Sequence, residues 1–425
     1  MNWAGIIGFL ISLGLLAGVQ DTLPDVSTEI PEAEVVQVNS AEVTREEEIA
    51  PGVEIHSGLS IRVNGTDYRV NLNDGKHTTG KQLHPNDRID IESAEPMGSV
   101  YLEWNTAPQP YVLRWDGGEM VCGRNGFLHE YIPLPEAVTG VSIVCETENA
   151  LCDVRLFTPG SAPDDVQVWL PPCQEADILV FPTHSDDDTL FFGTLISYYT
   201  IERQMTVQTA FMVDHRNPIR DHERLDGLWE MGVRHYPVLG TAPDTDLTKR
   251  PDVMAFYSHS NIEGWQVEQI RRFRPLVVVG HDLDGEYGNG GHKVNAYYLT
   301  LAVESAANPD LFPESARHYG VWDTPKLYLH LYADNEIIME VNESMTRDPE
   351  GRTPFQVAED AYKWHVSQQK LTYRVYQGSN PRYDCRRFGL YRTLVGFDTS
   401  NDVMENICEE MFRAMPSSVV ADCIP

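Results

Sequence analysis

Basic residues are scarce in this chain of 425 residues. It holds 32 Lys and Arg against 64 Asp and Glu, which gives a formal net charge of −32 at pH 7. Nucleic-acid binding depends on neutralising phosphates with basic side chains, so this balance argues against a nucleic-acid partner. It also argues against docking on anionic lipid. A neutral or cationic ligand fits such a charge better than a polyanion does.

Several common motifs are also missing. No C-x-x-C pair occurs among the seven cysteines, which argues against a cysteine zinc site. There is no G-x-S-x-G, no Walker loop and no dinucleotide glycine fingerprint after a predicted strand. The cysteines cluster as four and then three, which favours local disulfides in an oxidising compartment with one thiol left over.

The N-terminal segment predicts export. The apolar run from Trp3 to Val19 is short for a membrane span and has the length of a signal-peptide core. Residues 1–20 are therefore expected to be a signal peptide or an uncleaved membrane anchor, with a buried helix as the third possibility. Either of the first two makes the chain secreted or extracytoplasmic. Residues 21–50 hold nine acids and one base, which predicts a disordered spacer.

The 42% hydrophobic content of the whole chain excludes global disorder. The remaining residues show two different sequence patterns. Residues 51–170 show short alternating runs between turn signals, which predict a β-sandwich or jelly roll. Four aromatic residues there could either stack on sugars or fill the core: Tyr101, Trp104, Tyr111 and Trp115. Residues 174–412 alternate buried strands with helical patterns, which predicts a doubly wound α/β fold with a mostly parallel sheet. Residues 413–425 are expected to be a C-terminal tail.

Polar clusters follow two of the predicted strands. Thr183-His184-Ser185-Asp186-Asp187-Asp188 comes after the first, and the loop from His281 to His292 comes after the second. Ligands of such folds bind at the carboxyl ends of the strands. Adjacent acids repel one another, and a bound cation would relieve the repulsion. Two imidazoles and a carboxylate suit a hydrolytic zinc site, with iron or cobalt also fitting, whereas acidic loops alone would suit calcium or magnesium.

These residues resemble the PIG-L/LmbE-like deacetylases, which remove N-acetyl groups from amino sugars and sugar conjugates. Thr183–Asp188 is similar to the family's A-H-P-D-D-E signature, and Arg220-x-x-Glu223 to its R-x-x-E element. Asp284-Gly285-Glu286-Tyr287-Gly288 with His292 is similar to its N-G-E-Y-G-H-x-D-H loop. Ala361 with His365-x-Ser367-Gln368 is similar to its A-x-x-x-H-x-S-Q element.

The resemblance implies a role for each matching residue. His184, Asp187 and His292 match the zinc ligands, and Asp186 matches the general base. Tyr287 matches the tyrosine that helps to hold the carbonyl oxygen in the transition state, and Arg220 the arginine that contacts substrate. Asp214 ends the neighbouring strand and is a further candidate for facing the sugar.

One departure from the family pattern bears on catalysis. Asn289 stands where the family has a second histidine, the usual proton donor to the leaving amine, and an amide cannot donate that proton at neutral pH. The candidates that replace it are Asp186 acting as both base and acid, then His365, then His281. Asp188 and Glu223 are expected to orient neighbours, and Asp282, Asp284 and Glu286 to be hydrogen-bond partners within their loop.

The sequence therefore predicts an exported, zinc-dependent deacetylase of N-acetylated sugars, preceded by a candidate carbohydrate-binding domain. A non-catalytic glycan-binding protein that keeps the metal is the alternative that Asn289 favours. An amidase or esterase acting on non-sugar substrates would share the same machinery.

Overall fold

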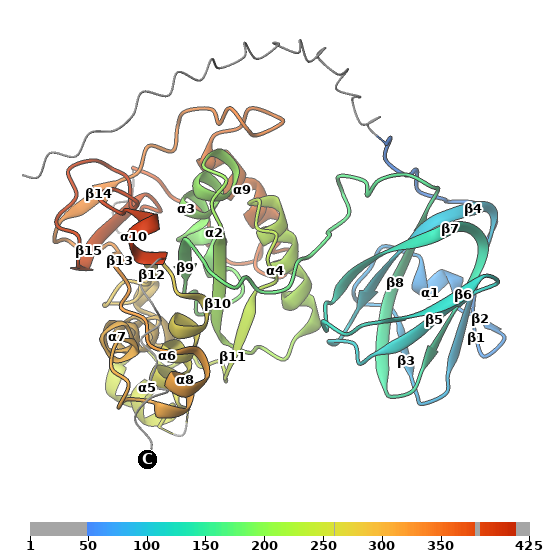
Figure 1. The fold of residues 1–425 in the computed structure, drawn as a ribbon, viewed down its shortest axis with the longest axis horizontal. Helices are drawn as coiled ribbons and strands as arrows, with labels where there is room; N and C mark the ends of the chain where they lie inside the picture. The colour runs from blue at the N-terminus through green and yellow to red at the C-terminus, as the bar shows by residue number, and fades with distance from the viewer. Residues whose placement is uncertain (1–48, 259, 379–382, 414–425) are drawn as a thin grey trace, which may run out of the picture. The chain divides into compact units, whose positions relative to one another are not determined.

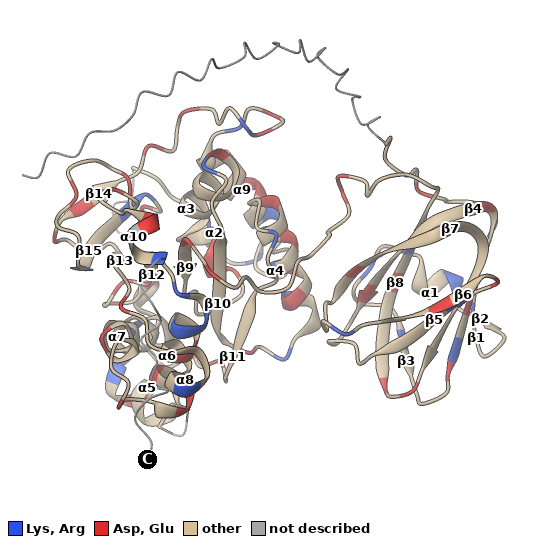
Figure 2. Cartoon of the chain, in the orientation of Figure 1, with Lys and Arg blue, Asp and Glu red and all other residues tan. Residues whose placement is uncertain are grey.

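The computed structural model describes residues 49–258, 260–378 and 383–413, which lie in one compact unit (Figure 1). The predicted signal peptide or anchor, almost all of the acidic spacer and the tail after Arg413 lie outside the described residues. Within them, no helix is both long enough and apolar enough to cross a membrane. Lys and Arg are scattered among the acids along the elements (Figure 2).

The N-terminal part is all-β apart from the one-turn helix α1 (Arg69–Leu72). Its strands pair antiparallel in one eight-stranded sheet, with β2-β1-β4-β7-β5-β6 as its main path and β8 bridging β3 and β4. A sandwich or jelly roll is therefore not confirmed, because the long strands β4 and β7 link all the others into a single sheet. The strands are β1 (Leu59–Val63), β2 (Thr66–Asp67), β3 (Lys81–Leu83), β4 (Arg88–Trp104), β5 (Tyr111–Trp115), β6 (Gly118–Cys122), β7 (His129–Cys145) and β8 (Asn149–Phe157).

The aromatic residues of this part belong to its interior. Tyr101, Trp104 and Tyr111 are at most 2% exposed, so they pack in the core and cannot stack on a sugar in solution. Only Trp115 is partly exposed, and its indole N–H donates to Glu136. The interpretation of these residues as core residues is thus the one that the structure supports.

The C-terminal part is built on a seven-stranded mixed sheet in the order β11-β10-β9-β12-β13-β15-β14. The pairings from β11 to β13 are parallel, and the edge pairings of β15 with β13 and β14 are antiparallel. The chain runs from β9 outward to β11 and then returns to the other side of β9. The strands are β9 (Ile178–Val180), β10 (Val207–Val213), β11 (Val238–Ala242), β12 (Val277–Gly280), β13 (Lys326–His330), β14 (Glu336–Ile338) and β15 (Arg387–Thr393).

Helices cover both faces of this sheet. Ile178 and Val180 of β9 share one core with α2, α3, α4 and α9, whereas Leu179 and Phe181 share another with α6 and α7. Successive residues of a strand point to opposite faces, so a fully apolar strand requires cover on both. The helices are α2 (Asp187–Leu190), α3 (Gly193–Ser197), the π-helix η1 (Tyr198–Glu202), α4 (Pro218–Glu230), α5 (Arg250–Phe256), α6 (Ile262–Phe273), the 3-10 helix η2 (Glu286–Gly288), α7 (Gly290–Ala306), α8 (Pro313–Tyr319), α9 (Pro354–Lys363) and α10 (Glu409–Arg413).

The expectation of local disulfides is wrong for the described cysteines. Cys122, Cys145, Cys152, Cys173 and Cys385 are free and buried, and Cys408 is free and exposed. The thiols of Cys122, Cys145, Cys173 and Cys385 pack as small apolar side chains within the cores, whereas that of Cys152 donates to the Glu103 carbonyl oxygen. Clustering along the sequence did not bring their sulfur atoms together.

A buried arginine ties α6 to the end of α7, the helix that begins at the candidate site. The Arg271 guanidinium donates to five carbonyl oxygens between Ser305 and Phe312 and to Ser315 Oγ. It is 1% exposed. This side chain therefore satisfies carbonyl groups in the last turn of α7 and in the segment between α7 and α8.

We expect Arg271→Met to lower the free energy of unfolding by about 3 kcal/mol, because the buried carbonyl groups lose their donors. Urea denaturation followed by circular dichroism measures the change. Arg272→Met, at the partly exposed neighbouring position, is the matched control. Equal losses in the two variants would contradict this account.

Candidate active site

The candidate site lies where the loops after β9 and β12 meet. Ile178 of β9 pairs in parallel with Val277 of β12, so both strands deliver their following loops to the same edge of the sheet. Because the chain reverses its direction across the sheet between these two strands, their carboxyl ends form the switch point at which such folds bind ligands. The loop 181–188 and the loop 281–292 thereby become neighbours.

Three donor atoms from these loops converge. His184 Nδ1 lies 3.0 Å from His292 Nε2, and Asp187 Oδ2 lies 3.2 Å from each of these nitrogens. All three side chains are buried. The backbone N–H groups of Thr183 and His184 also donate to Asp187 Oδ2, which fixes the carboxylate in place.

Two acids behind the histidines determine which ring nitrogen carries the proton. Asp244 Oδ1 lies 3.3 Å from His184 Nε2, and Glu286 Oε2 lies 2.8 Å from His292 Nδ1. An ionised carboxylate can only accept a hydrogen bond, so the protons sit on these outer nitrogens. The inner nitrogens, His184 Nδ1 and His292 Nε2, face each other beside the Asp187 carboxylate. A metal ion bound between them would take the place of any proton there, and a donor set of two nitrogens and one oxygen is one that zinc takes.

The electrostatics of the cluster agree with its affinity for positive charge. Although burial opposes it, Asp187 raises the pKa of His184 to about 8. Burial also acts against ionisation of Asp187, yet His292 and His184 hold its pKa well below the usual range. The carboxylate is therefore ionised at neutral pH, as a metal ligand must be.

Glu286 organises the layer behind the donor atoms. Its Oε2 accepts from His281 Nδ1 at 2.9 Å as well as from His292, and its Oε1 lies 2.6 Å from His330 Nδ1. His281 Nε2 in turn accepts the Thr183 N–H at 3.0 Å. Glu286 is thus a hydrogen-bond partner within its loop, and it connects both loops to β13 through His330.

The buried Asp186 and the partly buried Arg220 form an ion pair at the cavity. Arg220 Nη2 donates to Asp186 Oδ1 at 2.6 Å, and α4 holds Arg220 in position because Asn217 caps the start of that helix. Burial and the nearby Asp187 raise the pKa of Asp186, while Arg220 opposes this rise. The guanidinium fixes the orientation of the carboxylate and leaves its other oxygen free to take a proton.

Asn289 has a structural role that the sequence does not reveal. It is the N-cap of α7, and its side-chain oxygen accepts from the N–H groups of Gly291 and His292. This cap fixes the first turn of α7 and with it the backbone of His292. Tyr287, two residues earlier, has a left-handed backbone with φ of 55°. Such strained residues persist where the surrounding structure holds them, as it does here.

The converging residues line a cavity of about 170 Å³. The Tyr287 hydroxyl makes no hydrogen bond within the described part of the chain. The lining residues are His184, Asp186, Asp187, Leu190, Phe191, Arg220, Asp244, Thr245, Asp246, Tyr287, Asn289, His292, Gln368, Leu371 and Tyr373.

The structure places two of the predicted site residues elsewhere. His365 is fully buried and does not line the cavity, and burial together with Arg220 and Arg224 lowers its pKa to about 3. Its imidazole is therefore neutral at neutral pH, and the role of His365 as a proton donor stays a prediction. Asp214 also lies outside the cavity lining, because its carboxylate turns back to accept the Arg216 N–H.

Sequence reasoning missed Asp244, the acid that fixes the tautomer of His184 and also contacts His215 Nδ1 at 3.2 Å. The available signal was its place two residues after β11, the strand beside β10. Glu223 behaves as expected: it accepts from the Ser367 N–H and hydroxyl and so attaches the H-x-S-Q segment to α4.

We expect Glu286→Gln to weaken zinc binding by about 10–100-fold, because an amide cannot accept from all three histidines and their tautomers are no longer fixed. A competition titration with a chromogenic chelator measures the affinity. Asp284→Asn removes an exposed acid from the same loop and should leave the affinity unchanged. If both variants bind zinc like the parent chain, Glu286 does not support the donor set.

No protein-family model matches the chain. Over 211 residues it is 25% identical to the 1D-myo-inositol 2-acetamido-2-deoxy-alpha-D-glucopyranoside deacetylase of Streptomyces scabiei, a match that covers 43% of this chain and 64% of the relative. Over 180 residues it is 26% identical to the deacetylase 1 of the same name from Frankia casuarinae, covering 36% of this chain and 57% of the relative. The chain thus spans less than two thirds of the length of these curated relatives.

Among solved structures, the N,N'-diacetylchitobiose deacetylase from Pyrococcus horikoshii is 16% identical, with a TM-score of 0.35 over 46% of this chain and 72% of that one. A TM-score of this size does not establish a common fold, so the relationship rests on the sequence relatives. Those relatives confirm the resemblance of this chain to the PIG-L/LmbE-like deacetylase family.

Proposed function

We propose that this protein is a zinc-dependent hydrolase that removes N-acetyl groups from amino sugars or glycoconjugates. The observation that carries the proposal is the convergence of His184 Nδ1 and His292 Nε2, which lie 3.0 Å apart beside the Asp187 carboxylate. His184, Asp187 and His292 would hold the metal. Zinc bound there would supply a water of lowered pKa and would polarise the acetyl carbonyl.

Asp186 is the general base of this proposal. It is next in sequence to the proposed ligand Asp187, lines the cavity and is held by Arg220. Its carboxylate would take a proton from the attacking water and pass one to the leaving amine. Asp186 is the candidate for both steps because His365 and His281 are fully buried and do not line the cavity.

Tyr287 would donate a hydrogen bond to the carbonyl oxygen as negative charge develops on it. Burial raises the pKa of Tyr287, so the hydroxyl keeps its proton at neutral pH. A donor of this kind is typically worth about 10²–10³-fold in rate. The hydroxyl needs no rearrangement to act, because it makes no competing hydrogen bond within the described residues.

The cavity suits a polar substrate such as an amino sugar. Asp244, Thr245, Asp246 and Gln368 offer hydrogen-bonding groups for hydroxyls, and Tyr373 offers a ring face. The relatives' names describe a 2-acetamido-2-deoxy-glucopyranoside, which is consistent with this chemistry. The acidic side chains of the cavity also attract a cationic amine and repel an anionic ligand.

The second candidate is a glycan-binding protein without turnover, which Asn289 favours because it supplies no proton at the position of the family's histidine. Amine release from a panel of N-acetylated sugars separates the two. Hydrolysis that needs zinc and Asp186 supports the deacetylase. Retention of sugars without hydrolysis, with zinc bound, supports the binding protein.

We expect Asp186→Asn to lower kcat by about 10²–10⁴-fold, because the amide keeps the shape of the side chain but cannot accept a proton. Zinc content, measured by atomic emission on the same sample, should be unchanged. Asp284→Asn, at an exposed acid that does not line the cavity, is the matched control. Loss of zinc from Asp186→Asn would instead make this residue a ligand.

We expect Asn289→His to raise kcat if proton donation to the amine limits the rate, since it restores an imidazole at that position. The change also removes the α7 cap, which costs about 1 kcal/mol of stability. Asn289→Ala removes the cap without adding an acid, so comparing the two variants isolates the effect of the imidazole. Equal rates in both would show that Asp186 alone suffices.

A further inference from the structure

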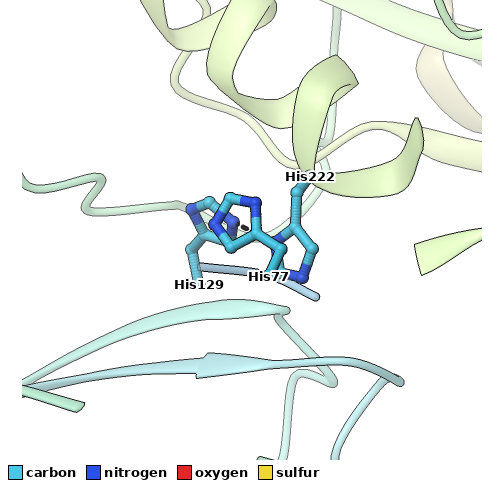
Figure 3. Close-up of side chains that lie close together, drawn as sticks. All are labelled: His77, His129 and His222. Atoms are coloured by element: carbon cyan, nitrogen blue, oxygen red, sulfur yellow. Dashed lines mark hydrogen bonds between the residues drawn. The ribbon is translucent and has the colours of Figure 1, made fainter. Parts of the chain in front are cut away.

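Three histidines meet away from the candidate active site, where the all-β part contacts α4 (Figure 3). His77 lies between α1 and β3, His129 begins β7, and His222 lies on α4. One nitrogen from each residue lies within 4.8 Å of the others. His129 and His222 are at most 1% exposed, and His77 is partly exposed. The proposed deacetylation uses none of them.

Each ring is held from outside the cluster. His77 Nε2 lies 2.9 Å from the partly buried carboxylate of Glu103, and His129 Nδ1 lies 2.9 Å from the Tyr101 hydroxyl. On the far side of His222, Nε2 faces Cys152 Sγ at 3.8 Å. The other nitrogens of His129 and His222 point at each other across 2.6 Å, as the dashed line in Figure 3 shows.

Proteins hold metal-ligating imidazoles from outside the ligand set in a similar way. A ligating histidine almost always uses its second nitrogen to bond a carboxylate, a carbonyl or another polar group, and that bond fixes the ring and its tautomer. Glu103 contacts the ring of His77 in the same way as Glu286 contacts the ring of His292. We propose that His77, His129 and His222 form a second zinc site, separate from the catalytic donor set.

Metal binding requires two defined movements. Zinc–nitrogen bonds of about 2.0–2.1 Å in tetrahedral geometry separate the ligand atoms by about 3.3 Å, so the ion replaces the hydrogen bond between His129 and His222. His77 is now stacked on His222 with ring centroids 3.8 Å apart and must turn toward the ion. Its side chain is 25% exposed and lies outside the regular elements, which gives it room to do so.

Zinc is the metal that these donors select. Neutral imidazoles favour zinc and its transition-metal neighbours over calcium or magnesium, which take oxygen ligands. A cation here would bind residues of both parts of the chain, and α4 carries Arg220 two residues before His222. The site would therefore fasten the all-β part to the helix that positions the general base.

The test is zinc stoichiometry of the full chain after loading with zinc and desalting. We expect two zinc ions per wild-type chain and one in His129→Ala. His292→Ala, which removes a catalytic ligand, should also retain one. His84→Ala removes an exposed histidine from the same part of the chain and should retain two.

These outcomes separate this proposal from the proposed deacetylase. A single wild-type zinc that persists in His292→Ala and disappears in His129→Ala supports the second site and contradicts the catalytic one. A single zinc lost only in His292→Ala overturns the second site. Two zinc ions in both His129→Ala and His77→Ala would overturn it as well.

The His77→Ala variant controls for loss of zinc through misfolding. Its side chain is partly exposed, so its removal disturbs the interior less than removal of the His129 side chain. Its circular dichroism spectrum should match that of the wild type, while its stoichiometry falls to one. Removing zinc with a chelator should lower the wild-type Tm more than that of His77→Ala. Equal falls in Tm would show that the cluster holds no metal that stabilises the fold.

Discussion

The parallel pairing of β9 with β12 is the constraint on which the candidate site depends. It brings two loops that are about a hundred residues apart to one edge of the sheet, and it places two imidazole nitrogens and a carboxylate oxygen within 3.2 Å of one another. This convergence is what would allow the three side chains to share one cation. The cores on both faces of the sheet stabilise the arrangement, because the apolar strands cannot move without exposing their side chains.

Around this centre, each catalytic candidate is held by a partner of opposite or complementary chemistry. Arg220 orients Asp186, Asp244 fixes His184, and Glu286 fixes His292. The same logic explains Asn289, since an N-cap needs a short side chain with an oxygen acceptor, which a histidine does not have. Asn289 thus caps α7 and also leaves the site without the histidine proton donor that the family has at this position.

The histidine cluster at α4 extends this logic to the all-β part. His222 lies between Arg220 and Glu223 in sequence, and those two residues hold Asp186 and the segment that contains Gln368. Whatever fixes α4 therefore fixes two walls of the cavity. A metal shared by His77, His129 and His222 would make the all-β part a support for the active site, independent of any binding of glycans.

Local sequence was sufficient where the chemistry lies within a short stretch. Neighbouring residues carry the signal for three features. These are the strand that precedes Thr183–Asp188, the loop that ends at His292 and the alternation of strands with helices. Residues whose roles depend on distant partners could not be assigned in this way. His365 matched a motif but lies buried behind the cavity, Asp214 turns back on its own loop, and the clustered cysteines are free.

The sequence by itself determined the all-β and α/β patterns, the candidate metal-donor residues and the resemblance to a deacetylase family. It could do so because periodicity and motif spacing are local properties. Only the tertiary structure decided that one continuous sheet forms the all-β part, that Asp244 lies against His184 Nε2 and that three histidines meet at α4. His77, His129 and His222 are separated by 52 and 93 residues, and no spacing rule connects them. Their proximity arises from the packing of β7 and the segment before β3 against one helix, which only the folded chain defines.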